Sequence, residues 1–86
     1  MICEVHLTKR AVAQIEHFMK EEATMILGWL ASNIQGSSDP QVLATPILGG
    51  QRDYLLYQIG RYCIYCIQDD DSIIVISIEI DNTIEV

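Results

Sequence analysis

Three strand-like segments separated by short turns fill the C-terminal part of the chain and restrict its fold more than any other feature. Residues 54–59, 62–68 and 72–80 are rich in Tyr, Ile and Val, which favour extended backbone. A glycine turn at 60–61 and an aspartate run at 69–71 separate them, and both residue types are common in tight turns. The pattern predicts a meander of three antiparallel strands.

The N-terminal part combines one strand pattern with two helical patterns. Residues 1–7 place apolar side chains at every second position, which indicates a half-buried strand. Thr8 can cap a helix through its hydroxyl, and apolar residues recur at helical spacing over 12–19 and again over 23–34. Since no Gly or Pro separates the two patterns, one long helix from about 9 to 35 is an alternative to a helical hairpin.

The length and composition fit one small domain over residues 1–86. The chain has 86 residues and half of them are apolar, which is enough for a modest core. Gly36 and the two prolines that follow it predict a loop to Gly50. We expect an α+β fold in which an N-terminal strand and a two-helix hairpin precede the meander. The sheet would have about four strands, with the hairpin on one face.

Charge and hydropathy narrow the possible partners and the location. Twelve acidic residues against five basic ones give a formal net charge of -7, which repels phosphate backbones. Direct binding of nucleic acid is therefore disfavoured. The first residues lack the basic start and apolar stretch of a signal peptide, and no apolar run approaches the ~20 residues of a membrane span. We expect a cytoplasmic protein that does not bind a membrane.

The order of these elements resembles the RelE/ParE superfamily of toxin–antitoxin toxins. The resemblance covers nearly the whole chain: a short strand, two helices, a loop ending in 48–50 (Leu-Gly-Gly), a Tyr strand, a Gly-x-Tyr turn, an Ile-Tyr strand, an acidic turn and an Ile/Val strand. It implies a RelE/ParE-like fold with a hairpin that bends near 20–23. It also implies a toxin-like subunit of a type II toxin–antitoxin module, active in plasmid stabilisation and growth regulation, with a cognate antitoxin as its partner.

The resemblance also implies where catalytic residues would lie. Ribonucleases of the RelE branch cleave messenger RNA on the ribosome with Lys, Arg, Tyr, His or Glu side chains on and just beyond the last three strands. Such a reaction needs an acid, a base and cations around the reacting phosphate. In this sequence the candidates are Arg61, Tyr62 and Tyr57, with Arg52 as a further possibility.

Because basic residues are so few, we expect action by protein binding or a loss of catalysis, and whether the chain is an enzyme stays open. One alternative is a ribosome-dependent mRNA endoribonuclease with an altered site around Arg61 and Tyr62. Another is an acidic, non-enzymatic interaction protein on the same scaffold.

The last strand predicts a surface for a partner. Its first half is apolar on both faces, and the helical hairpin can cover only one of them. We predict that Ile73 and Val75 lie on the uncovered face and that they, with Arg52, contact a partner. The partner would be the antitoxin or a second copy of the chain.

The cysteines and tyrosines are interpreted as packing residues. Cys63 and Cys66 match a C-x-x-C pattern, but on a strand they point to opposite faces roughly 10 Å apart. We therefore expect reduced thiols, no metal and no cofactor. Tyr62 and Tyr65 likewise alternate, so at least one of them should pack under the helices.

Overall fold

The computed structural model describes residues 2–48 and 54–81. Their strands form a five-stranded sheet in the order β1-β5-β4-β3-β2. The elements in chain order are β1 (Glu4–Leu7), α1 (Lys9–His17), α2 (Lys20–Asn33), the short 3-10 helix η1 (Pro40–Leu43), β2 (Thr45–Ile47), β3 (Tyr54–Ile59), β4 (Tyr62–Asp69) and β5 (Ser72–Ile80). β1 runs parallel to β5, and the other neighbours are antiparallel. The α+β class and the three-strand meander are confirmed.

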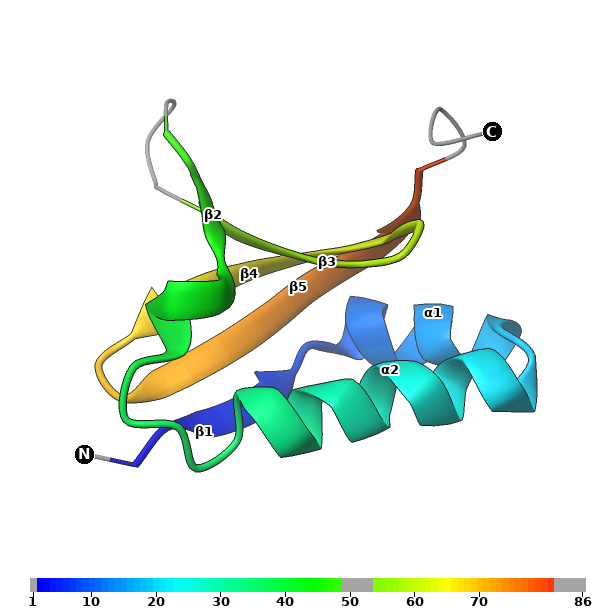
Figure 1. Cartoon of the computed structure of the whole chain (residues 1–86). Coiled ribbons are helices and arrows are strands. Elements are labelled where there is room, and N and C mark those ends of the chain that lie inside the picture. The colour runs from blue at the N-terminus through cyan, green and yellow to red at the C-terminus, as the bar shows by residue number, and fades with distance from the viewer. Residues whose placement is uncertain (1, 49–53, 82–86) are drawn as a thin grey trace.

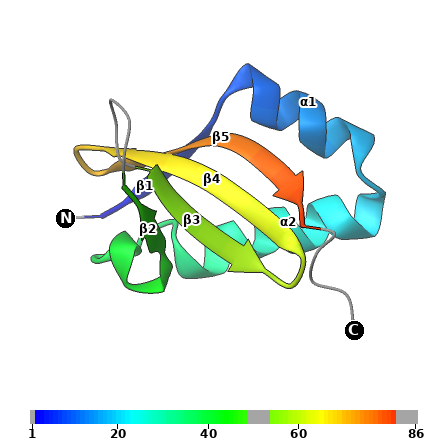
Figure 2. The ribbon, with the colours of Figure 1, turned by 90° about the horizontal axis from the view of Figure 1, so that it is seen from above.

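Both long helices lie on one side of the sheet (Figure 1). Seen from above, α2 runs beneath the sheet and α1 lies beside β5 (Figure 2). Neither helix of the described chain is long and apolar enough to cross a membrane.

A break at Phe18 and Met19 separates the two helices. Both residues have extended backbone, with φ/ψ of -79°/159° and -63°/151°. The Met19 backbone N–H donates to the Glu22 carboxylate at 3.0 Å and so begins α2. The hairpin is therefore correct and the single long helix is wrong, although the bend precedes the predicted 20–23.

The predicted loop from 36 to 50 contains a further strand. Thr45–Ile47 pairs antiparallel with β3, and Pro46 stands opposite Leu55. Proline has no N–H for a ladder and argues against a strand in a sequence pattern, but it is tolerated at a sheet edge. The expectation of about four strands is corrected to five for this reason.

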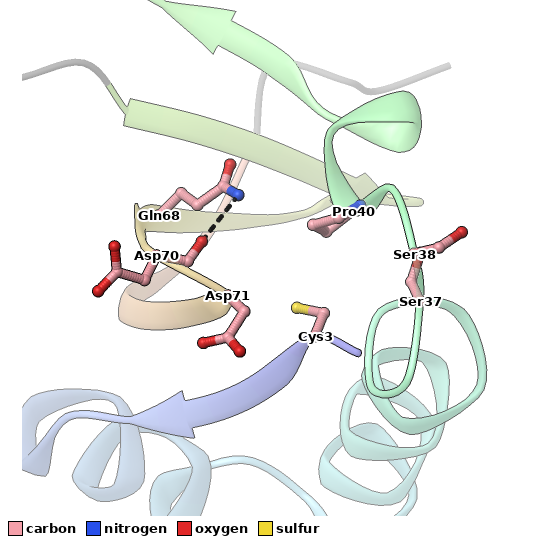
Figure 3. A pocket seen from close by; sticks show the side chains of 7 residues that line it. All are labelled: Cys3, Ser37, Ser38, Pro40, Gln68, Asp70 and Asp71. Carbon is pink, nitrogen blue, oxygen red and sulfur yellow. Dashed lines mark hydrogen bonds between the residues drawn. The ribbon is translucent and has the colours of Figure 1, made fainter. Parts of the chain in front are cut away.

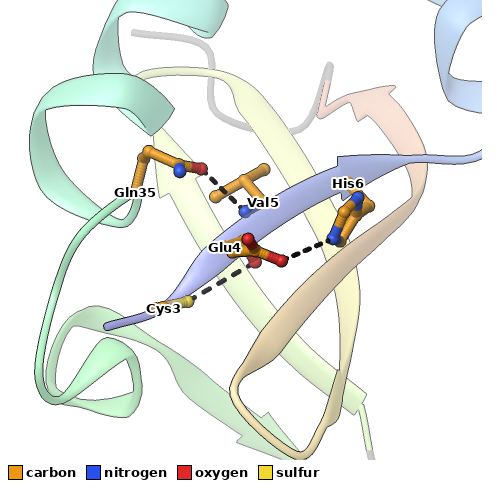
Figure 4. Close-up of polar contacts among 5 residues, drawn as sticks. All are labelled: Cys3, Glu4, Val5, His6 and Gln35. Carbon is orange, nitrogen blue, oxygen red and sulfur yellow. Dashed lines mark hydrogen bonds and ion pairs between the residues drawn. The ribbon is translucent and has the colours of Figure 1, made fainter. Parts of the chain in front are cut away.

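The other edge of the sheet is covered by the segment that follows α2. The Cys3 N–H donates to the Ser37 carbonyl at 3.0 Å, and the Gly36 N–H donates to the Cys3 carbonyl at 2.8 Å. The Val5 N–H donates to the side-chain oxygen of Gln35 at 2.8 Å (Figure 4). One edge thus ends in a strand that contains proline and the other is partly bonded, so addition of a partner strand is disfavoured at both.

The core lies between the sheet and the helices. It joins apolar side chains of α2 to those of the three longest strands, and its largest fully buried members are Tyr57, Ile26, Ile34, Ile64, Ile73, Val75 and Cys66. Tyr62, Ile64 and Cys66 share this inner face. At least one tyrosine therefore packs under the helices, as predicted.

A β-bulge in β5 decides which isoleucines enter the core. Tyr65 pairs with Ser77 and Cys66 with Val75, which leaves Ile76 without an opposite residue. The extra residue changes the alternation, so Ile78 joins the buried side.

The prediction that Ile73 and Val75 lie on an uncovered face is wrong. Both are 0% exposed and belong to the core cluster with α2. The error has a simple cause: the sequence shows that both sides of β5 are apolar, but it does not show which side the helices cover. The uncovered side presents Ile74 and Ile76, both half-buried.

Candidate functional site

A shallow groove of about 390 Å³ lies on the outer face of the sheet, which we define as the face opposite α2. Its walls come from α1, β2, β3, β4 and β5 and consist of Arg10, Ile47, Tyr54, Tyr65, Ile76 and Ser77. We call this surface the outer groove. Most of its lining is aliphatic or aromatic, which suits the side chains of another polypeptide.

Strand pairing explains how distant residues meet in the outer groove. β2 sets Ile47 opposite Tyr54, and both are 37% exposed. On the other side Tyr65 pairs with Ser77, next to the bulged Ile76. This groove could not be predicted from the sequence, because it depends on the unpredicted β2 and on the bulge.

Gln14 of α1 fixes the polar border of the outer groove. Its amide nitrogen donates to Glu79 at 3.0 Å and to the Ser77 hydroxyl at 3.3 Å, and its oxygen accepts from the Ile78 N–H at 2.7 Å. The Ser77 hydroxyl also donates to Glu79. These hydrogen bonds hold the pKa of Glu79 below its ordinary value, with a smaller contribution from Arg10. Glu79 is thus a fixed, ionised border residue.

Arg10 is the charged side chain of the groove lining. It lies in the first turn of α1 and is exposed. Within the part of the chain that the structure describes, no carboxylate lies within ion-pair distance of Arg10. Its guanidinium interacts electrostatically with Glu79 but forms no ion pair with it, so its N–H groups can still bind a ligand.

Tyr57, one of the predicted catalytic residues, belongs to the core. It is 0% exposed, its ring lies 5.8 Å from that of Trp29, and its hydroxyl donates to the Pro40 carbonyl. Burial raises its pKa well above the ordinary value. A substrate at the surface cannot reach this hydroxyl in this conformation.

The other two predicted catalytic residues, Arg61 and Tyr62, lie together at the β3–β4 turn. Tyr62 is 7% exposed, packs 5.8 Å from the Phe18 ring, and donates its hydroxyl to Glu22. The Arg61 guanidinium lies 4.0 Å from the same carboxylate and 5.8 Å from the Tyr62 ring. Glu22 was missed because it lies on α2, far from the turn in sequence.

This cluster of Arg61, Tyr62 and Glu22 is distinct from the outer groove, with which it shares no residue. The hydrogen bond from the Tyr62 hydroxyl to the Glu22 carboxylate raises the pKa of Tyr62 and lowers that of Glu22. The cluster fastens the meander to the start of α2. Arg52, the remaining site candidate, lies outside the described residues.

The acidic turn borders a small cavity at the opposite end of the strands. This cavity of about 140 Å³ is lined by Cys3, Ser37, Ser38, Pro40, Gln68, Asp70 and Asp71 (Figure 3). Asp70 has a φ of 55°, and its carbonyl accepts from the Gln68 side chain at 3.2 Å. Over residues 2–48 and 54–81, no three His, Cys, Asp or Glu side chains are grouped to hold a metal ion. The positive φ of Asp70 is typical of a tight turn, which agrees with the interpretation of these aspartates as turn residues.

The three cysteines are buried free thiols. Cys66 faces the core, and Cys63 points to the other side of β4, as predicted for a C-x-x-C pattern on a strand. Burial raises the pKa of Cys66 to about 12. Thiolate chemistry is thereby disfavoured at this position.

Comparison with solved structures identifies the fold. A chain of the toxin–antitoxin complex RelBE2 from Mycobacterium tuberculosis is similar with a TM-score of 0.81 and 11% identity, over 93% of this chain and 99% of that chain. A chain of the archaeal RelE–RelB complex from Pyrococcus horikoshii gives 0.73 and 15%, over 95% and 98%. No protein-family profile and no curated protein matches the sequence. The fold is RelE-like, as the order of the sequence elements predicted.

Proposed function

We propose that this chain is the toxin-like subunit of a type II toxin–antitoxin module and that it acts by binding protein, with RNA cleavage lost. Its RelE-like fold supports the first part, because the similar solved chains come from complexes of toxin and antitoxin. Its partner would be a cognate antitoxin.

The outer groove carries the second part of the proposal. Cleavage of RNA needs an acid, a base and cations around the phosphate. Among the described residues, the groove lining instead offers isoleucines, tyrosines, one serine and a single cation. Tyr57 and Tyr62 face the helices, away from this surface. An apolar groove with one cation is better suited to a polypeptide than to a phosphate backbone.

The closed edges of the sheet support the same mode of binding. The β1 edge is bonded to residues 35–37, and β2 contains Pro46. These edges favour a partner that binds through side chains on a face of the sheet over one that adds a strand. The net charge of -7 adds repulsion of nucleic acid, which also agrees with the purely interacting, acidic alternative.

One observation favours the ribonuclease alternative. Arg61, Tyr62 and Glu22 place a cation, a phenol and a carboxylate together at a partly exposed turn. However, the phenol already donates to Glu22 and its pKa is raised, so it is a weak acid for the leaving oxygen. We therefore rank this alternative second.

Co-expression with the product of a short neighbouring reading frame tests the proposed partner. We expect the two proteins to purify together, and we expect Tyr65→Asp to abolish the complex because it places a charge on the groove floor. Thr24→Asp, an exposed site on α2, is the matched control. Loss of the complex with Thr24→Asp but not with Tyr65→Asp would contradict the assignment of the groove.

Primer extension on ribosome-bound mRNA tests the loss of catalysis. We expect no new cleavage sites when the chain is expressed alone. Cleavage that disappears with Arg61→Ala would reject the proposal in favour of the altered-site ribonuclease.

A further inference from the structure

We propose that the polypeptide segment bound in the outer groove carries one carboxylate, which pairs with Arg10, between apolar side chains that fill the groove. This inference rests on the proposed protein-binding function and adds the chemistry of the partner. The expected segment is apolar where it contacts the groove and acidic at one position, with no further acidic residues next to that position.

The position of Arg10 sets the first requirement. It forms one wall of the groove, opposite the aliphatic and aromatic side chains Ile47, Tyr54 and Tyr65. A segment that fills the groove removes water from this guanidinium. A buried, unpaired cation is costly, so a fitting segment must supply an acceptor.

Among the described residues, the chain places no acceptor within ion-pair distance of Arg10. Glu79 is the acidic neighbour and interacts with Arg10 electrostatically, but it lies beyond ion-pair distance. Its Oε2 atom already accepts from Gln14 and Ser77. Among the described residues the ion pairs are Glu4 with His6 and Glu22 with Arg61, and neither involves Arg10. A carboxylate is the natural partner because its two oxygens match the planar fork of arginine.

The remaining charge of the molecule sets the second requirement. The net charge of -7 repels a partner that is acidic overall and attracts one that is neutral or basic. At one end of β5 lie Asp70 and Asp71, and at the other Glu79 and Asp81. Acidic residues flanking the bound carboxylate would meet these groups. The segment therefore needs a single acid in a neutral or basic context.

Selection from a display library of short random peptides tests this chemistry without knowledge of the natural partner. The full chain is the bait, alongside the variants Arg10→Glu, Lys9→Glu and Ile76→Asp. Lys9 is the matched control, because it is the neighbouring exposed cation and does not line the groove. Thermal unfolding of each bait verifies that it is folded.

We expect the natural chain and Lys9→Glu to select apolar peptides with an Asp or Glu at a fixed spacing. Arg10→Glu should select Lys or Arg at that position, and Ile76→Asp should select none of these peptides. In fluorescence anisotropy, replacing the selected carboxylate by its amide should weaken binding about tenfold or more for the natural chain. The same replacement should change little for Arg10→Gln, which has no charge to pair.

Three results would overturn the inference: no enrichment, peptides without a fixed acidic position, or an acid that persists with Arg10→Glu. Peptides that depend on Ile76 but lack the acid would reject only the paired carboxylate, and the groove would stay a protein-binding site. Failure of the proposed function is a separate result, seen when the two co-expressed proteins do not purify together. A complex that survives Tyr65→Asp would reject only the groove as its binding site.

Discussion

Tyr57 joins β3 to the first residue of η1 through one buried hydroxyl. Its ring fills the core beside Trp29, and its hydroxyl donates to the Pro40 carbonyl. Tyr57→Phe keeps the ring but leaves this carbonyl unpaired, so we expect a loss of about 1–2 kcal/mol in the free energy of unfolding. Urea denaturation of the variant and of the natural chain measures this loss. Tyr54→Phe removes a hydroxyl on the outer face and is the control; an equal loss in both variants would refute the role of this hydrogen bond.

Glu22 makes the stability of the fold depend on acid pH. The hydrogen bond from Tyr62 is the main cause that holds its pKa below the ordinary 4.5. A carboxyl with a lowered folded-state pKa contributes stability above its unfolded pKa and loses it as the pH falls through the folded pKa. We expect Glu22→Gln to flatten the decrease in melting temperature below about pH 4.5, relative to Glu21→Gln. Parallel curves for the two variants would show that this carboxylate contributes nothing.

At the scale of the elements, two glycines should respond to alanine with opposite signs. Gly28 lies inside α2, where an added Cβ would meet no atom within 4 Å. Gly28→Ala should therefore raise the free energy of unfolding by about 0.5–1 kcal/mol, because glycine is a poor helix former. Gly60 has a φ of 57° in the β3–β4 turn, so Gly60→Ala should lower it by about 1 kcal/mol. Chemical denaturation of both variants measures these two changes. A loss of stability in Gly28→Ala would contradict the prediction for this helix position.

The elements also show which parts of the fold could be predicted from sequence. Local chemistry fixes β3 and β5, whose bounds agree with the predicted segments, because a glycine and Asp70 both adopt positive φ at the turns. Thr8 likewise begins α1 as predicted, by accepting from the Ala11 N–H. By contrast, β2 contains a proline, and only its pairing with β3 makes it a strand. The bulge at Ile76 has no local signal, so the burial of Ile78 on the same side as Ile73 and Val75 could not be predicted.

The candidate site was less predictable than the fold for the same reason. The tyrosines and Arg61 were selected from their place in the RelE-like order, but their surroundings depend on long-range packing. Local sequence patterns show neither the pairing of Tyr62 with Glu22 on a distant helix nor the burial of Tyr57 beside Trp29. The outer groove needs five elements to form and could be found only from the structure.

Across the whole molecule, apolar and charged surfaces are separated in a way that suits a protein partner. Among the described residues, the lining of the outer groove has one cation and no carboxylate, while most acidic residues lie in turns, at helix starts and at strand ends. Both sheet edges are closed by contacts or by proline. The RelE-like scaffold thus offers a face for binding in place of an edge.

Calorimetric titration of the purified chain with its co-expressed partner tests the central claim most directly. We predict that Ile76→Asp, on the groove floor, raises the dissociation constant about a hundredfold or more. The substitution buries a carboxylate against apolar groups. Thr24→Asp on α2 should leave it within about twofold of the natural chain. Tight binding by Ile76→Asp, or an equal loss with Thr24→Asp, would contradict the assignment of the outer groove as the protein-binding site.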